Sequence, residues 1–113
     1  MNGSDPDLVV VLTTLPDVDQ ARQMARRLLE DRLAACATVL PTAESHYVWN
    51  EECQSAVEVL VIIKTTRLAY PRLEARLKEC HPYEVPEIVA LPAVGAWPAY
   101  VAWVGAACGP GGD

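Results

Sequence analysis

Residues 43–65 read AESHYVWNEECQSAVEVLVIIKT. Two strand-like arms flank the polar pair Asn50-Glu51, a pattern typical of a β-hairpin. The first arm carries Tyr47 and Trp49 near its end, and the second contains the apolar run 57–63. Residues 33–40 extend the first arm beyond Pro41, where we expect a bulge or kink because proline interrupts strand pairing. Arms of about fourteen residues span roughly 46 Å, more than the roughly 34 Å diameter of a compact chain of this size. We therefore expect the hairpin to protrude.

The segment before the hairpin predicts one strand and one helix. Residues 8–14 form a continuous apolar run rich in β-branched residues, which indicates a buried strand. Asp17 is followed three residues later by Gln20, a helix-capping pair. Apolar residues then recur at helical spacing, so we expect a helix over about 17–32.

The segment after the hairpin predicts a helix, a strand and a short terminal helix over 67–80, 88–91 and 96–107. The order β-α-β-β-α-β is typical of an α+β, ferredoxin-like sandwich, in which two helices cover one face of a four-stranded antiparallel sheet. The other, apolar face would stay uncovered, which favours oligomerisation. We expect a disordered N-terminus at 1–7, a single domain at 8–107 and a flexible tail at 108–113.

Composition narrows the classes of partner. The net charge of −6 and the sequence pI near 4.8 argue against nucleic acid, which needs clustered cations. No apolar run is long enough to cross a bilayer, and residues 1–7 lack the pattern of a secretion signal. We therefore expect a cytoplasmic protein with no membrane partner. In that compartment the four cysteines, which form no CxxC pair, would be free thiols or soft-metal ligands.

Residues 80–87, CHPYEVPE, concentrate a thiol, an imidazole, a phenol and two carboxylates. The two prolines fix their own φ angles and restrict the residues before them, so the segment should be stiff and extended. Such a segment can hold a ligand site, or it can be a passive corner that ends a helix and directs the next strand.

Six local patterns together resemble the CutA divalent-cation tolerance family over residues 8–104. They are TTLPD at 13–17, LAAC at 33–36, SHYVW at 45–49, Glu58 with IKT at 63–65, HPYEVPEI at 81–88 and YVAW at 100–103. The resemblance implies a homotrimer similar to the PII signal proteins, joined through the hairpins. It also implies a link to copper and other divalent cations, with no organic cofactor and no established reaction.

The chain departs from the family pattern at three positions. Glu51 stands where members often have glycine, so the turn of the hairpin would differ in shape. Thr13 and Cys80 stand where some members have a cysteine and a histidine. The first change removes one metal ligand and the second replaces an imidazole with a thiol.

The resemblance supports Cys36, Cys80 and His81 as metal ligands, and thiolates and imidazoles suit Cu(I) or zinc. The alternative is structural. In that interpretation Cys36 and Cys80 are small core residues, since free cysteine is commonly buried, and His81 hydrogen-bonds the corner.

Glu58 and Lys64 interrupt an otherwise apolar strand, and a charge in such a place needs a partner or a cleft. Six residues apart, they face the same side of the sheet. One interpretation joins them with Tyr83, Glu87 and a neighbouring subunit's Trp49 into a pocket for a small anionic ligand. The other is a network of intersubunit salt bridges that fixes the assembly.

An enzyme has little support, because the chain lacks a glycine-rich phosphate loop, a GxSxG motif and an HExxH motif. The leading hypothesis is a homotrimeric, CutA-like protein that binds copper or another divalent cation, or a small ligand, between subunits. The alternatives are a PII-like sensor of small molecules and a purely structural trimeric scaffold with incidental metal affinity.

Overall fold

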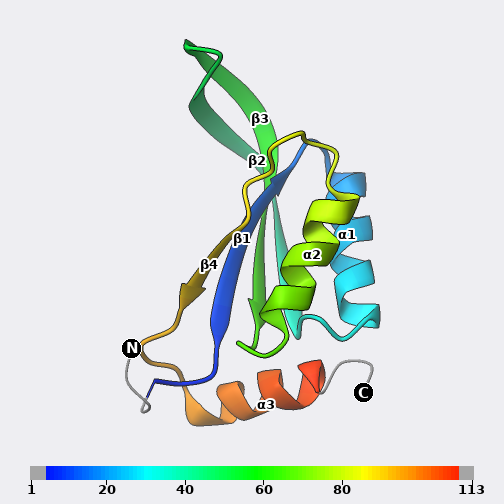
Figure 1. The fold of residues 1–113 in the computed structure, drawn as a ribbon, viewed down its shortest axis with the longest axis vertical. Helices are drawn as coiled ribbons and strands as arrows, with labels where there is room; N and C mark the ends of the chain where they lie inside the picture. The colour runs from blue at the N-terminus through cyan, green and yellow to red at the C-terminus, as the bar shows by residue number, and fades with distance from the viewer. Residues whose placement is uncertain (1–4, 110–113) are drawn as a thin grey trace.

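The computed structural model describes residues 5–109, which form four strands and three helices (Figure 1). In chain order they are β1 (Val9–Leu15), α1 (Val18–Glu30), β2 (Cys36–Trp49), β3 (Glu52–Thr65), α2 (Tyr70–Cys80), β4 (Val89–Pro92) and α3 (Pro98–Cys108). This order is the predicted one. Helix α2 begins later than expected because residues 67–69 form a turn, and Pro71 occupies the first helical turn, where its missing N–H costs no helical bond.

The strands pair in the order β2-β3-β1-β4, and every neighbouring pair is antiparallel. Helices α1 and α2 lie side by side on one face of this sheet, and α3 crosses beneath its lower end (Figure 1). The prediction of a ferredoxin-like sandwich is therefore confirmed. The edges of the sheet are the long strand β2 and the short strand β4.

Helix α1 begins and ends with local hydrogen bonds. The Asp17 carboxylate accepts from the backbone N–H of Gln20 at 2.8 Å and from its side-chain amide at 2.7 Å. These bonds favour the ionised form and lower the pKa of Asp17. The pairing of Asp17 with Gln20 is thus confirmed as the helix cap.

Arg32 follows α1 with a left-handed φ of 58°. The backbone N–H groups of Arg32 and Leu33 return to carbonyl oxygens in the last turn, as in a Schellman motif. The Arg32 guanidinium donates to the carbonyl oxygens of Ala106 and Ala107, at 3.0 and 3.3 Å. One residue therefore ends α1 through its backbone and binds the end of α3 through its side chain.

The β2–β3 hairpin protrudes as predicted (Figure 1). The molecule measures 42 × 29 × 22 Å, and its radius of gyration of 14.7 Å exceeds the roughly 13 Å of a compact chain of this length. The expected bulge is present as a register shift between Leu40 and Ala43. At the tip, Asn50 and Glu51 both have positive φ, 51° and 65°, which is the backbone of a type I′ turn.

The core lies between the sheet and helices α1 and α2. Alternate residues of β1 and β3 point toward the helices and are buried, as the two-residue period of a strand requires. The fully buried side chains of this layer include Val11, Leu15, Leu28, Val61, Ile63, Leu73 and Leu77.

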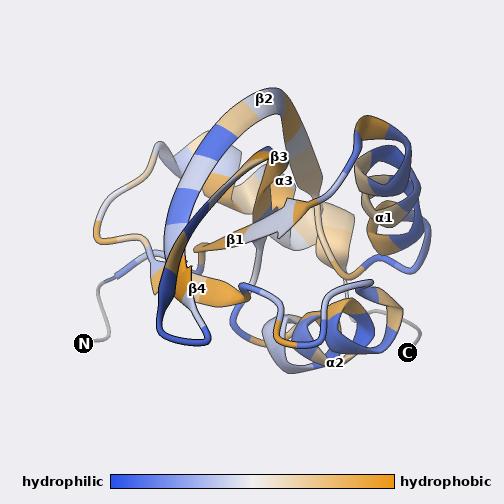
Figure 2. Cartoon of the chain, turned by 90° about the horizontal axis from the view of Figure 1, so that it is seen from above, coloured by the Kyte–Doolittle hydropathy of each residue, from blue (hydrophilic) through white to orange (hydrophobic). Residues whose placement is uncertain are grey.

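The opposite side of the sheet, which we call the open face, is also apolar. Its apolar members include Val10, Leu12, Leu40, Leu60, Ile62, Val89 and Leu91. Leu40, Val89 and Leu91 are 40%, 44% and 47% exposed, and Figure 2 shows the apolar character of β4. The uncovered apolar face expected from the sequence is therefore present in the protomer.

A second core cluster joins α3 to the lower end of the sheet. It contains Leu8, Ala69, Val104 and Cys108. Cys108, expected to begin a flexible tail, instead ends α3 and is fully buried, with its sulfur 3.6 Å from the Thr65 hydroxyl. This is a correction, and its reason is that a small apolar thiol fits between helix and sheet.

The predictions for the termini fall mostly outside residues 5–109. Asp7, expected to be disordered, has a partner, because its carboxylate accepts from the backbone N–H of Arg67 at 2.9 Å.

Within the described range, each helix is too short or too polar to span a membrane.

Candidate functional site

The loop that follows α2 is fixed to the sheet by His81. The imidazole is 8% exposed. Its Nδ1 accepts from the backbone N–H of Tyr83 at 3.1 Å, and its Nε2 lies 2.7 Å from the carbonyl oxygen of Thr14. Because Nδ1 accepts, the proton resides on Nε2, which donates to Thr14. Burial lowers the pKa of His81, which favours this neutral form.

Tyr83 extends from this loop to the base of the hairpin. Its hydroxyl donates to Glu58 Oε2 at 2.6 Å, and its ring lies 4.9 Å from that of His81, centroid to centroid. Burial, followed by the hydrogen bond to the Glu58 carboxylate, raises the pKa of Tyr83. The negative field of Asp17 and the Tyr47 hydroxyl act in the same direction. The phenol is therefore a stable donor to the carboxylate.

The structure brings together only part of the predicted interface pocket. Tyr83 and Glu58 are in contact, and Glu87 is exposed on the same loop. Lys64 lies six residues from Glu58 along β3, and Trp49 at the hairpin tip pairs with Glu52, also six residues away. Each separation is roughly 20 Å at about 3.3 Å per residue. Lys64 and Trp49 therefore do not reach Tyr83 within one protomer.

The three predicted metal ligands are also separated. Cys36 lies opposite Lys64 on the open face, and Cys80 ends α2 on the side of the helices. His81 has both ring nitrogens engaged. No group of three or more histidine, cysteine, aspartate or glutamate side chains is placed to hold a metal ion among residues 5–109. The predicted set is thus not assembled within a protomer.

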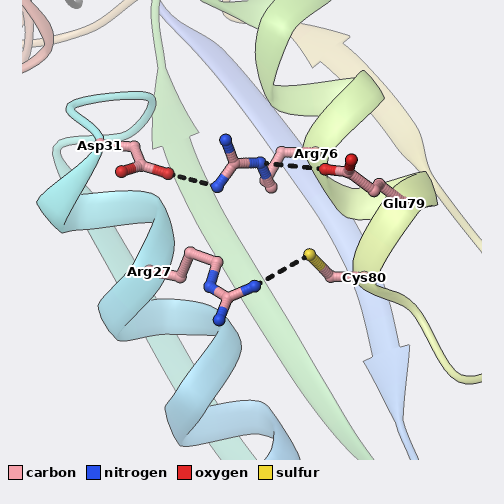
Figure 3. Close-up of polar contacts among 5 residues, drawn as sticks. All are labelled: Arg27, Asp31, Arg76, Glu79 and Cys80. Atoms are coloured by element: carbon pink, nitrogen blue, oxygen red, sulfur yellow. Dashed lines mark hydrogen bonds and ion pairs between the residues drawn. The ribbon is translucent and has the colours of Figure 1, made fainter.

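Polar contacts that the sequence did not predict join α1 to α2 (Figure 3). Arg27 on α1 donates from Nη1 to the Cys80 sulfur at 3.3 Å. Arg76 forms ion pairs with Asp31, the residue that caps the end of α1, and with Glu79 on its own helix. Helical periodicity identifies the face on which Arg27 lies, but it does not show that the neighbouring helix ends within reach of its side chain.

A family model and individual known proteins relate this chain to the same family. Residues 9–107 match the family model described as CutA1 divalent ion tolerance protein. The divalent-cation tolerance protein CutA of Thermus thermophilus is 45% identical over 95 residues, which cover 84% of this chain and 92% of the relative.

Solved structures share the fold. CutA from Xylella fastidiosa superimposes with a TM-score of 0.88 at 33% identity, covering 91% of this chain and 99% of that one. A protein from Archaeoglobus fulgidus, described as a periplasmic divalent cation tolerance protein CutA, superimposes with a TM-score of 0.87 at 27% identity. That match covers 90% of this chain and 99% of the other.

Proposed function

Since this chain belongs to the CutA1 divalent ion tolerance family, we propose that it acts by binding divalent cations, copper among them, as a homotrimer. Its role is binding without a chemical reaction. The contact between Tyr83 and Glu58, 2.6 Å long, is the observation that carries the proposal, because it holds a partly buried carboxylate at the base of the protruding hairpin. Carboxylate oxygens bind divalent cations well, and the exposed Glu84 and Glu87 lie on the same loop.

Two surfaces of the protomer support the proposed assembly. The open face is apolar and partly exposed, and β2 is a fourteen-residue edge strand. Exposed apolar faces and long unpaired edges promote association. We propose that neighbouring subunits cover both, and the number three rests on the family resemblance alone.

The ligand site is proposed to lie between subunits. One protomer supplies Glu58, Tyr83 and Glu87, and a neighbour supplies Trp49 from its hairpin tip. This arrangement accounts for the roughly 20 Å that separate Trp49 from Glu58 within one chain. Lys64 is half-buried on the open face, where a charge needs a partner across an interface.

Light scattering and calorimetry test this proposal. We expect the mass of a trimer at micromolar concentration, and saturable binding of Cu²⁺ or Zn²⁺ that is weakened at least about tenfold by Glu58→Gln, because the substitution removes a charged ligand. Glu44→Gln, an exposed carboxylate on the hairpin, is the matched control. A stable monomer would reject the trimer, and equal affinity in wild type and Glu58→Gln would reject the site.

The hydrogen bonds of His81 favour a second function, that of a structural scaffold with incidental metal affinity. Its two nitrogens serve the fold and neither has a free lone pair for a metal. Full assembly together with the absence of saturable divalent binding would support this alternative.

The cytoplasm is the compartment that we propose, because the chain has four free cysteines, and thiols persist in a reducing environment. Cell fractionation tests this location. Recovery in the periplasm, the location given for the Archaeoglobus relative, would reject it.

A further inference from the structure

A small cavity lies between α1, α2 and the loop that follows α2, on the side of the sheet that the helices cover. Its volume is about 110 Å³, about four times the roughly 30 Å³ that one water molecule occupies in the liquid. Its lining residues are Leu15, Gln20, Gln23, Met24, Arg27, Cys80 and Pro82. No carboxylate is among these lining residues, so the only permanent charge on the wall is that of Arg27.

The Arg27 guanidinium has only a weak acceptor as its partner. Its Nη1 donates to the Cys80 sulfur at 3.3 Å (Figure 3), and a neutral thiol accepts hydrogen bonds poorly. Among residues 5–109 no carboxylate forms an ion pair with Arg27. Most of its five N–H donors are therefore available to a negatively charged ligand.

The nearby carboxylates of α1 do not offset this charge. Asp31, one turn after Arg27, is bound by Arg76 of the facing helix. Asp17 lies ten residues before Arg27, roughly 15 Å along a helix that rises about 1.5 Å per residue. That separation exceeds the roughly 8 Å over which salt leaves exposed charges in contact. Glu30 is exposed, where water and salt weaken its field.

A glutamine extends the donor surface along α1. Gln23 precedes Arg27 by four residues, so the two side chains lie one turn apart on the same face of the helix. Gln20, at the far end of the cavity, already donates its amide to Asp17 at 2.7 Å. No hydrogen bond engages the Gln23 amide within the described part of the chain. Gln23 can therefore supply a second donor group beside the guanidinium.

The inner wall of the cavity is apolar and its rim is open to solvent. Leu15 is fully buried and Met24 is 6% exposed, whereas Gln23 and Arg27 are exposed at the rim. An apolar wall lowers the local dielectric and strengthens the attraction between a guanidinium and an anion. The exposed rim gives such an ion a route from solvent.

We propose that this cavity binds a small oxyanion, either inorganic phosphate or a monocarboxylate. The planar guanidinium of Arg27 presents parallel N–H donors that match two oxygen atoms of one ion, and the Gln23 amide donates to the same ion. Cys80 stays a neutral thiol, so no covalent bond forms or breaks. The charges of ion and guanidinium neutralise each other beside the apolar wall.

The inference goes beyond the proposed function, because it concerns an anion and uses none of the residues proposed to bind the divalent cation. Glu58 lies on the open face of β3, whereas Met24 and Cys80 pack against the core between sheet and helices. The cavity is complete in one protomer, so the inference does not depend on the trimer.

Backbone-amide NMR tests the inference on the wild-type chain. Sodium phosphate and sodium acetate are added in separate titrations at constant pH and ionic strength, with sodium chloride as the control. Saturable shifts are expected for residues 23–28 and for Cys80. Shifts with phosphate identify a tetrahedral ion as a ligand, and shifts with acetate identify a carboxylate. No saturable shift at these residues with either ion overturns the inference.

Alkylation of Cys80 by iodoacetamide reports occupancy of the cavity directly. At an ion concentration about ten times the Kd, the reaction should slow by up to about tenfold, because only the unoccupied fraction reacts. Cys53, exposed on the hairpin, is the internal control and should react at an unchanged rate. An unchanged rate at Cys80 at that ion concentration overturns the site.

A pair of arginine variants separates the site from the general charge of the helix. Arg27→Gln should weaken binding of the ion at least about tenfold, since a charge-assisted, bidentate contact is lost. Arg26→Gln removes the same charge one residue away, at an exposed position outside the cavity, and should stay within about twofold of wild type. Equal weakening in both variants, or no weakening in Arg27→Gln, overturns the inference.

Discussion

The hydroxyl of Tyr83 lies 2.6 Å from Glu58 Oε2 and connects the loop after α2 to the base of the hairpin. The same loop is anchored to β1 through His81 and the Thr14 carbonyl oxygen. Two side chains two residues apart thus tie one loop to two strands. Substitutions at these positions should therefore affect stability as well as ligand binding.

Tyr83→Phe removes the hydroxyl and leaves the partly buried Glu58 carboxylate without this donor. We expect the free energy of unfolding to fall by about 1–2 kcal/mol, since a hydrogen bond to a charged group is lost. Urea denaturation measures the change. Tyr47→Phe is the control, because Tyr47 is 44% exposed on the hairpin, and an equal loss in both variants would contradict the role of the Glu58 bond.

His81 should make the protein less stable in acid. Burial lowers its pKa below the ordinary value of 6.5, so the unfolded chain binds a proton more readily than the folded one. The contribution of neutral His81 to the free energy of unfolding is complete above about pH 6.5. It is lost as the pH falls toward the lower pKa of the folded state.

Denaturation at several pH values on both sides of 6.5 measures this effect. His81→Gln keeps a donor for the Thr14 carbonyl oxygen but does not titrate, so its stability should fall less in acid than that of the wild type. An identical pH profile for both proteins would show that other groups cause the acid sensitivity.

Glu51→Gly should stabilise the hairpin. Glu51 has a φ of 65°, which costs a residue with a side chain about 1–2 kcal/mol and costs glycine almost nothing. The greater freedom of glycine in the unfolded chain offsets about 0.5–1 kcal/mol of this gain. We expect a net increase in the free energy of unfolding of up to about 1 kcal/mol.

Thermal or urea denaturation measures that increase. Glu52→Gly, one residue later at the start of β3, is the matched control. It should destabilise by about 0.5–1 kcal/mol, because glycine weakens an ordinary strand position. A loss of stability in Glu51→Gly would show that the Glu51 side chain makes compensating contacts.

Gly109→Ala and Gly105→Ala should have opposite effects. Gly109 has φ 54° and ψ −167°, a region nearly restricted to glycine, so alanine should cost about 1–3 kcal/mol. A Cβ atom there would also lie 2.4 Å from Arg32 Nη2 and displace the guanidinium from the end of α3.

At Gly105, inside α3, an added Cβ meets nothing within 4 Å. Alanine there should stabilise by up to about 1 kcal/mol, the difference in helix propensity. The two variants, compared by chemical denaturation, differ in position but share the same chemical change. Equal effects would contradict the conformational constraint at Gly109.

The sequence predicted the fold well because its patterns are local. The apolar strand run at 8–14, the Asp17 cap and the interruption at Pro41 each depend on residues close together in the chain, and each is confirmed. The error at Cys108 has a different cause. A glycine-rich neighbourhood indicated a tail, but the lower end of the sheet offers that thiol a buried position, which no local pattern reveals.

The candidate site was less predictable. Glu58 and Tyr83 were expected to meet, and they do. Cys36, Cys80 and His81 were grouped by chemical type, yet one lies on the open face, one faces α1 and one is engaged in hydrogen bonds. Chemical type indicates what a residue can bind but not which residues share a cavity.

The order of elements, the length of the hairpin and the apolar open face can be predicted from the sequence, because hydrophobic periods and turn residues act within single elements. Three relationships come from the folded structure: Tyr83 binds Glu58, His81 carries its proton on Nε2, and Arg27 binds the sulfur of Cys80. These relationships depend on how separate elements are oriented and packed. A difference of a few ångströms in that packing decides whether two side chains touch, and no short-range pattern specifies it.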